Sequence, residues 1–298
     1  MQRLFCPVGV VYVFLLDFLQ RHDLALDWVN DMPLAAEADH YVMMEQEAAP
    51  YMPLIAAVAD RATPVSQDFF TALLQGAYRI HGQTGGDKIA TFAGIFASAP
   101  RGDVVEIGVL AGRSAYGLAV LGAHYEMPAM VVIDPWTFED LRHETSAELV
   151  FRFPYVDFDK FRRGFIMNLR HVMRPPLAML HTTSHDAYDT YRQAPITISS
   201  EAFGSANLTG KIGVIHIDGN HDEAAVVQDC EQWLPHVLAD GWVILDDYIW
   251  AHGDGPQLAG DRLLARYPDH IKRVFVIEKG LFIQLSKPLP RPLNLRAD

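Results

Sequence analysis

The chain has 298 residues, half of them hydrophobic, and a formal net charge of -13 from 37 acidic and 24 basic side chains. This length allows one large domain with a sizeable buried core, and the hydrophobic content excludes a disordered chain. The acidic balance argues against a nucleic-acid partner, because binding a duplex requires a basic surface. The two cysteines form no CxxC pair, which excludes a disulfide framework and a zinc knuckle. We expect free thiols in a reducing, cytoplasmic compartment.

The first part of the chain combines an apolar run with a helical pattern. The run at residues 4–19 contains Asp17 and is shorter than the roughly 20 residues that span a bilayer. No small-residue cleavage site follows it, so we interpret it as a buried piece of the fold rather than a membrane span or a signal sequence. Thr63-Pro64 precedes a predicted helix over residues 65–80. We expect residues 1–80 to form a helical N-terminal extension that acts as a lid or an oligomer interface.

From residue 101 onward, short β-branched runs alternate with helical stretches. The predicted strands cover residues 103–107, 129–133, 178–181, 212–217 and 241–245, the predicted helices cover 113–124, 224–238 and 257–267, and a hairpin covers 273–277 and 280–285. This alternation predicts a doubly wound α/β fold with a mostly parallel sheet covered on both faces. We expect the α/β domain to span residues 81–290 and a loose tail to follow at 291–298.

A glycine-rich turn joins the first predicted strand to the next helix, in the run E-I-G-V-L-A-G-R-S that starts at Glu106. Gly108 and Gly112 allow a tight turn and a close approach of the backbone to a ligand, and Ser114 can cap the helix. Leu110 stands where a dinucleotide-binding G-x-G-x-x-G pattern has its second glycine, so the spacing disfavours NAD.

Acidic side chains near the ends of the first two strands are typical of a nucleoside site. Asp134 ends the second strand and can accept hydrogen bonds from ribose hydroxyls, while Glu106 can meet a positively charged amino or sulfonium group. Ser184 could approach an adenine. The alternative interpretation is that these acids are helix caps or loop charges.

A second acidic cluster follows the fourth and fifth strands. Asp218 ends the fourth strand, and Asp246 and Asp247 end the fifth, so three carboxylates should meet at one edge of the sheet. Mg²⁺ prefers oxygen ligands and would offset their repulsion. The alternative is that Asp218 caps a helix and the pair is half-exposed. His221 follows Asp218 in the same loop and can act as a general base, or it is a surface residue.

Four runs of the sequence together resemble class I S-adenosylmethionine (SAM)-dependent methyltransferases: E-I-G-V-L-A-G-R-S, V-I-D-P-W, H-I-D-G-N-H-D-E and G-W-V-I-L-D-D-Y. The resemblance is strongest to the metal-dependent macrolide-sugar O-methyltransferases of the mycinamicin and macrocin type, which are related to cephalosporin-hydroxylase-like proteins. It implies a seven-stranded Rossmann-like sheet with an antiparallel last strand. It also implies roles for individual residues: Glu106, Gly108 and Ser114 at the methionine end of SAM, Asp134 at the ribose, and Pro135 and Trp136 beside the adenine. Asp218 is expected to be a catalytic and cofactor-binding residue as well as a metal ligand.

The function that this resemblance implies is methyl transfer to a hydroxyl of a small molecule such as a natural-product sugar. Mg²⁺ held by Asp218, Asp246 and Asp247 would bind the acceptor oxygens, and His221 would remove the proton. An N-methyltransferase acting on an amine, a non-methylating enzyme on the same fold and a non-catalytic SAM-binding protein remain as alternatives. We expect a homo-oligomer with neither a nucleic-acid nor a membrane partner.

Overall fold

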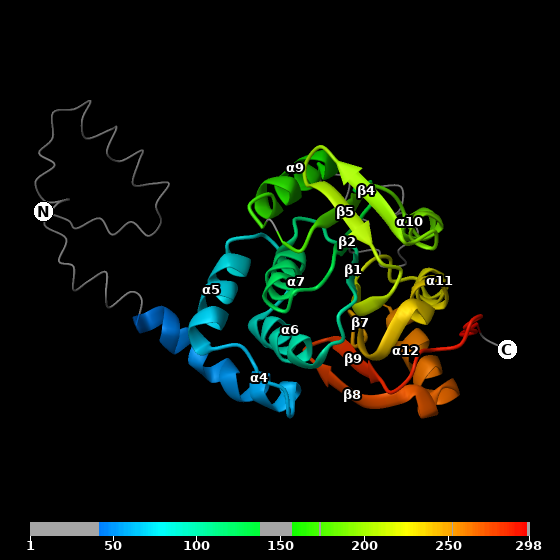
Figure 1. Ribbon diagram of the computed structural model, residues 1–298. Coiled ribbons are helices and arrows are strands. Elements are labelled where there is room, and N and C mark those ends of the chain that lie inside the picture. Colours follow the sequence, from blue (N-terminus) through cyan, green and yellow to red (C-terminus); the bar gives the residue numbers. More distant parts are fainter. Residues whose placement is uncertain (1–41, 138–156, 173, 252, 297–298) are drawn as a thin grey trace, which may run out of the picture. The chain divides into compact units, whose positions relative to one another are not determined.

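The computed structural model describes residues 42–137, 157–172, 174–251 and 253–296 (Figure 1). At its centre lies a seven-stranded sheet with the strand order β3-β2-β1-β6-β7-β9-β8. The strands are β1 (Asp103–Ile107), β2 (Met130–Ile133), β3 (Leu177–Leu180), β6 (Ile212–Ile217), β7 (Val237–Leu245), β8 (Ile271–Ile277) and β9 (Gly280–Leu285). The first five of these pair in parallel, whereas β9 is antiparallel to both β7 and β8. The predicted sheet with an antiparallel end is confirmed.

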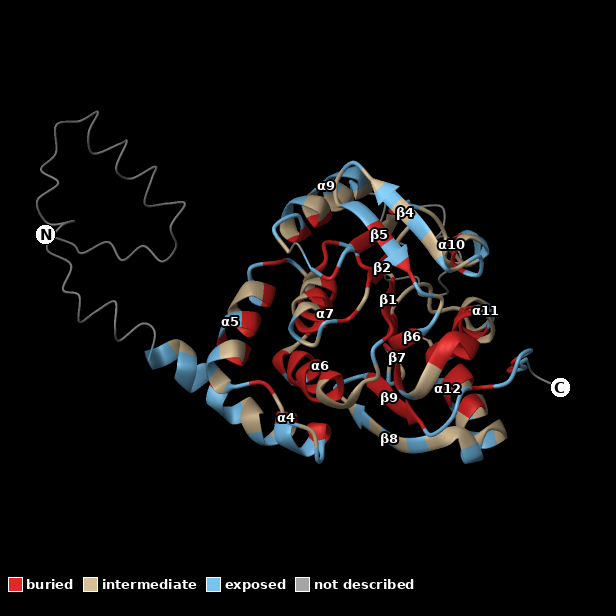
Figure 2. Cartoon of the chain, in the orientation of Figure 1, coloured by how far each residue is buried: buried red, intermediate tan, exposed pale blue. Residues whose placement is uncertain are grey.

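Helices cover both faces of the sheet because successive strand residues point to opposite sides. Val104 packs into a core with α4 (Met52–Ala59), α5 (Gln67–Tyr78), α6 (Gly86–Ser98), α7 (Arg113–His124) and α9 (Phe158–Leu169). Val105 packs into a second core with α10 (Ser184–Tyr191), α11 (Glu223–Trp233) and α12 (Gly255–Arg266). The central strands are buried throughout (Figure 2), which explains why they read as continuous apolar runs.

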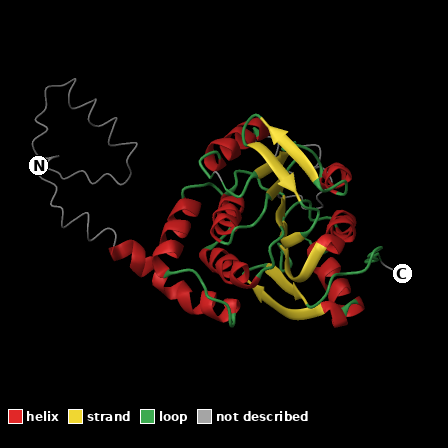
Figure 3. Cartoon of the chain, in the orientation of Figure 1, coloured by secondary structure: helices red, strands yellow, loops and turns green. Residues whose placement is uncertain are grey.

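Several elements were not predicted (Figure 3), namely α6, α9, α10 and the separate hairpin of β4 (Ile196–Ser200) and β5 (Gly204–Leu208). The helix predicted over 224–238 is wrong at its end. There α11 stops at Trp233, a 3-10 turn follows at Leu234–His236, and β7 starts at Val237. Pro235 explains this end, because proline interrupts the hydrogen bonding of a helix interior.

The chain divides into two compact units, Met1–Glu47 and Ala48–Asp298. The apolar run at residues 4–19 lies outside the described residues. The 3-10 turn Ala49–Tyr51 opens the second unit, and Ile55 of α4 and Phe70 of α5 are buried in the same core as the sheet. The boundary predicted at residue 80 is therefore wrong, because these helices complete the core of the α/β unit. Within the described ranges, no helix is both long and apolar enough to cross a bilayer.

The C-terminal segment packs against α11 and α12 as far as it is described. Leu293 and Leu295 are buried, the N–H of Leu295 donates to Glu231, and Arg262 donates to the carbonyl of Leu295. The prediction of a loose tail is wrong for residues 291–296. Its prolines restrict the backbone without preventing the alternate leucines from entering the core.

Candidate functional site

The glycine turn after β1 has the conformation that its sequence predicts. Gly108 and Gly112 have φ angles of +80° and +93°, in the region that favours glycine. A Cβ on Gly108 would overlap the carbonyl oxygen of Asp218, so this turn lies directly against the loop that follows β6. A Cβ on Gly112 would lie 2.8 Å from Phe165 and Leu169 of α9. Neighbouring protein atoms therefore account for both glycines.

Asp134, at the end of β2, holds the glycine turn in place. Its Oδ2 accepts hydrogen bonds from the N–H groups of Val109 and Leu110, both at 2.9 Å, and its Oδ1 accepts one from Trp136 N–H at 2.7 Å. Burial raises the pKa of this carboxyl, although these hydrogen bonds oppose the shift. Three of its roughly four lone-pair positions are thus used by the protein, and one is left for a ribose hydroxyl.

Three predicted cofactor residues make contacts with the protein itself. Ser114 is buried in the first turn of α7 but does not cap it, because the N-cap is Gly112 without a side-chain hydrogen bond. The predicted capping is wrong. Trp136 is 5% exposed and donates its indole N–H to the carbonyl of Leu110. Ser184, the first residue of α10, donates its hydroxyl to Asp229 at 2.5 Å.

Glu106 is fully buried on β1. A hydrogen bond of 2.9 Å joins its Oε1 to Nδ1 of His216, on the adjacent strand β6. Its other oxygen, Oε2, is buried and has no hydrogen-bond partner within the described part of the chain. An unpaired buried carboxylate oxygen is costly in free energy, so a bound ligand with a cationic donor would stabilise this position. Glu106 therefore fits the predicted ammonium or sulfonium end of a nucleoside ligand.

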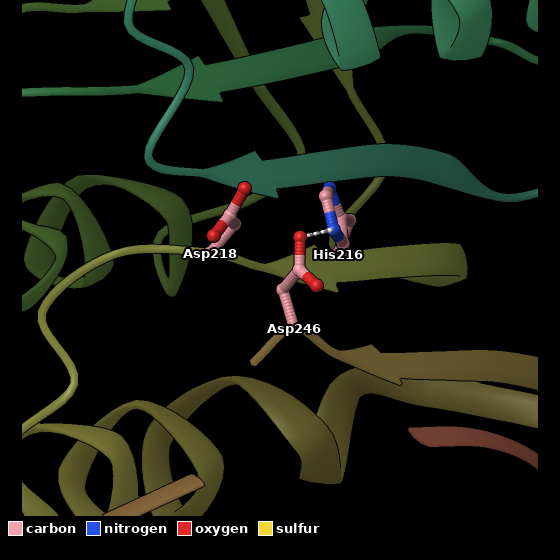
Figure 4. Close-up of side chains that lie close together, drawn as sticks. All are labelled: His216, Asp218 and Asp246. Carbon is pink, nitrogen blue, oxygen red and sulfur yellow. Dashed lines mark ion pairs between the residues drawn. The ribbon is translucent and has the colours of Figure 1, made fainter. Parts of the chain in front are cut away.

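A buried chain of charges continues from Glu106 through His216 and Asp246 to Lys88. Nε2 of His216 lies 3.4 Å from Oδ2 of Asp246 (Figure 4), and Nζ of Lys88 lies 2.5 and 2.6 Å from the two oxygens of that carboxylate. Burial opposes the charge of His216, but its hydrogen bonds to Asp246 and Glu106 raise its pKa to about 10. Burial likewise opposes ionisation of Asp246, but His216 and Lys88 hold its pKa well below the usual value. These four residues thus form one connected set of buried ionisable groups.

Lys88 was not predicted as a site residue. It lies in the first turn of α6, and no charged side chain follows it until Arg101. One lysine beside Asp87 in the first turn of a helix with no further charged residue was the only signal in the sequence, and such a residue is usually exposed. Here Lys88 is 5% exposed, and the nearby negative charge of Asp246 overcomes burial and raises its pKa.

The second group at this edge of the sheet contains Asp218, His221 and Asp247. Nε2 of His221 lies 3.4 Å from Oδ2 of Asp247 and 3.9 Å from Oδ1 of Asp218, and its ring lies 4.5 Å from that of Trp250. Burial, together with the charge of Asp246, raises the pKa of both Asp218 and Asp247. The structure therefore brings the predicted base next to two of the three predicted metal ligands.

The three aspartates predicted as metal ligands fall into two clusters. Both oxygens of Asp246 accept hydrogen bonds from Lys88, while one ligand atom from each of His216, Asp218 and Asp246 lies within 4.8 Å of the others. The role of Asp246 as a metal ligand therefore stays a prediction. One ligand atom from each of Asp218, His221 and Asp247 lies within 4.8 Å of the others, which is close enough to surround one ion. Mg²⁺ is commonly held by one or two carboxylates with water and substrate oxygens, so Asp218 and Asp247 fit it.

Comparison with known proteins gives a matching family model and a similar fold. Residues 105–248 match the family model described as "Methyltransferase domain". The O-methyltransferase NovP is similar in structure, with a TM-score of 0.51 and 16% identity over 70% of this chain and 83% of that one. The TDP-rhamnose 3'-O-methyltransferase CalS11 gives a TM-score of 0.44 and 13% identity over 80% of this chain and 94% of that one. An O-methyltransferase from Bacillus cereus gives a TM-score of 0.44 and 14% identity over 80% of this chain and 100% of that one. No curated protein matches the sequence.

Proposed function

We propose that residues 105–248, which match a methyltransferase family model, form a class I SAM-dependent methyltransferase domain that methylates a hydroxyl oxygen of a small molecule. The observation that carries the proposal is the imidazole of His221, held beside the carboxylates of Asp218 and Asp247. The loop that bears Asp218 touches the glycine turn at Gly108, so a nucleoside side and an acceptor side adjoin each other.

The nucleoside side is supported by Glu106 and Asp134. Glu106 offers a buried oxygen without a partner to the amino group of SAM, and Asp134 offers its remaining lone pair to a ribose hydroxyl. SAM, when bound, supplies an activated methyl group. These residues bind and orient it so that the methyl group can meet the acceptor at attack distance.

On the acceptor side, Nε2 of His221 would take the proton of the hydroxyl. Asp247 and Asp218, at 3.4 and 3.9 Å, stabilise the positive charge that this ring gains. The same two carboxylates would hold Mg²⁺, which lowers the pKa of a hydroxyl bound to it. A hydroxyl must lose its proton to become a good nucleophile, whereas a neutral amine needs neither a base nor a metal. The pairing of a base with carboxylates therefore favours an oxygen acceptor, with natural-product sugars as the first class to examine.

The test measures S-adenosylhomocysteine release from labelled SAM with a panel of sugar and phenol hydroxyls and, separately, amines. We expect O-methylated products. The His221→Gln variant should lower kcat by roughly 10²- to 10⁴-fold, the usual range for a general base, with the Kd for SAM within about twofold of the parent protein. His270→Gln, which alters an imidazole bonded to the carbonyl of Pro288, is the matched control and should be neutral. N-methylated products, or unchanged turnover of His221→Gln, would overturn the proposal.

A further inference from the structure

We propose that Lys88 is a resident counter-ion that withholds Asp246 from any divalent cation at this site, so that the cation is held by Asp218 and Asp247. The inference rests on the proposed function, because it concerns the metal proposed for the acceptor side. It assigns a role to a residue that lies outside the 105–248 methyltransferase segment.

The first argument is that three hydrogen bonds already occupy Asp246, two of them from the ammonium of Lys88. A carboxylate offers about four lone-pair positions. Oδ1 of Asp246 accepts from Nζ of Lys88 at 2.5 Å and from the N–H of Asp247 at 2.8 Å. Oδ2 lies 2.6 Å from the same ammonium and 3.4 Å from Nε2 of His216. A metal ion at Asp246 would have to compete with the ammonium of Lys88, which contacts both oxygens.

The second argument is that Lys88 cannot easily move away. Its side chain is 6% exposed and that of Asp246 is 7% exposed, so water does not replace either partner. The N–H of Lys88 donates to Oε1 of Glu278 at 3.2 Å, and a Cβ on Gly85 would overlap the same carboxylate. The turn between β8 and β9 therefore clamps the start of α6. Removing the ammonium from Asp246 would leave a buried unpaired charge, which is strongly unfavourable.

The third argument concerns charge. The ammonium of Lys88, which is buried with Asp246 at 2.5 Å, already supplies this carboxylate with a cationic partner. Asp247 faces His221 and lies 3.7 Å from the exposed ammonium of Lys279. Asp218 also faces His221, and it lies close to His216 and Asp246 as well. Two carboxylates leave several coordination positions of Mg²⁺ open to water and substrate oxygens. The consequence is a weakly held, exchangeable ion.

The experiment is a titration of the full chain with Mn²⁺, followed by electron paramagnetic resonance of the free ion. Lys88→Met should bind Mn²⁺ at least about tenfold more tightly than the parent, because Asp246 becomes a third anionic ligand. The double variant Lys88→Met/Asp246→Asn should return to within about twofold of the parent affinity. Lys272→Met removes an ammonium that is paired with Asp240 at 2.5 Å on the surface, and as the matched control it should change nothing.

Two further variants keep the proposal testable if Lys88→Met does not fold, as judged by thermal unfolding. Asp246→Asn alone should change Mn²⁺ affinity by less than about twofold, whereas Asp247→Asn should weaken it at least tenfold. A folded Lys88→Met that binds Mn²⁺ no more tightly than the parent, or a large loss in Asp246→Asn, overturns the role of Lys88. Unchanged affinity in Asp247→Asn overturns the proposed metal ligands instead. If Lys88→Met binds Mn²⁺ tightly and the parent binds none, the role of Lys88 as the counter-ion of Asp246 is supported. The same result refutes a metal ion in the parent protein.

Discussion

A buried acid between α10 and α11 should make the stability of the protein depend on pH. Asp229 is 4% exposed, and the hydroxyl of Ser184 donates to its Oδ1 at 2.5 Å. Burial raises the pKa of Asp229 from 3.8 to about 7, and neither this hydrogen bond nor the charge of His185 offsets the shift. The informative change is Asp229→Asn, because the amide oxygen can accept the same hydrogen bond without carrying a charge.

The sign and size of the effect follow from this shift. Between 3.8 and about 7 the native state binds a proton that the unfolded state has lost, so the free energy of unfolding falls as the pH rises through this window. The stabilisation that this proton provides is fully present below the unfolded-state pKa of 3.8 and is lost above the native-state pKa of about 7. A shift of about 3 pH units, at roughly 1.4 kcal/mol per unit, corresponds to about 4 kcal/mol in total.

Urea unfolding followed by circular dichroism at several pH values measures this effect. Because about half of the window lies above pH 5.5, the parent should lose about 2 kcal/mol relative to Asp229→Asn between pH 5.5 and 8.5. Ser184→Ala removes the hydrogen bond that favours the ionised form, so its loss over the same range should be at least as large. Parallel stability curves for the parent and Asp229→Asn would refute the reasoning, because they would mean that Asp229 titrates alike in both states.

Two further predictions concern the nucleoside side. Gly108→Ala combines a φ of +80° with a Cβ that overlaps the carbonyl of Asp218, so thermal unfolding should show a loss of at least about 2 kcal/mol, and calorimetry should show weaker SAM binding. An unchanged melting temperature would contradict the packing of this turn. Glu106→Gln removes the charge offered to the amino group of SAM and should weaken SAM binding roughly tenfold in calorimetry, while Mn²⁺ affinity stays the same. Equal SAM affinity would remove Glu106 from the cofactor site.

The sheet was predictable because its central strands are buried on both faces and bounded by glycine or acidic residues. The bounds predicted for residues 103–107 and 212–217 are those of β1 and β6. Burial had the contrary effect on the helix α6. This helix is buried on nearly all sides, so its sequence lacks the polar face that reveals a helical period. The β4-β5 hairpin is half-exposed and polar, and its strands carry no strong apolar alternation.

The site was predictable as far as its residues follow strands. The carboxyl ends of parallel strands meet at one edge of a sheet, and this rule placed Asp218, His221 and Asp247 together from spacing alone. Lys88 is 158 residues from Asp246 and reaches it from a helix, so their contact depends on tertiary packing that no local pattern contains. The sequence also could not show that the protein itself uses most of the lone pairs of Asp134. Its hydrogen bonds to the glycine turn depend on the register between β1 and β2.

The pair Asp246-Asp247 shows why adjacent identical residues can differ in role. Asp246 follows the last residue of β7 and turns into the buried charges of Lys88 and His216. Asp247 has a φ of +49°, a left-handed conformation that is uncommon for aspartate, and its N–H is held by the side chain of Asp246. This turn directs the second carboxylate towards His221. The side chain of one member thus holds its neighbour in an uncommon conformation, in which the neighbour faces His221 and Lys279.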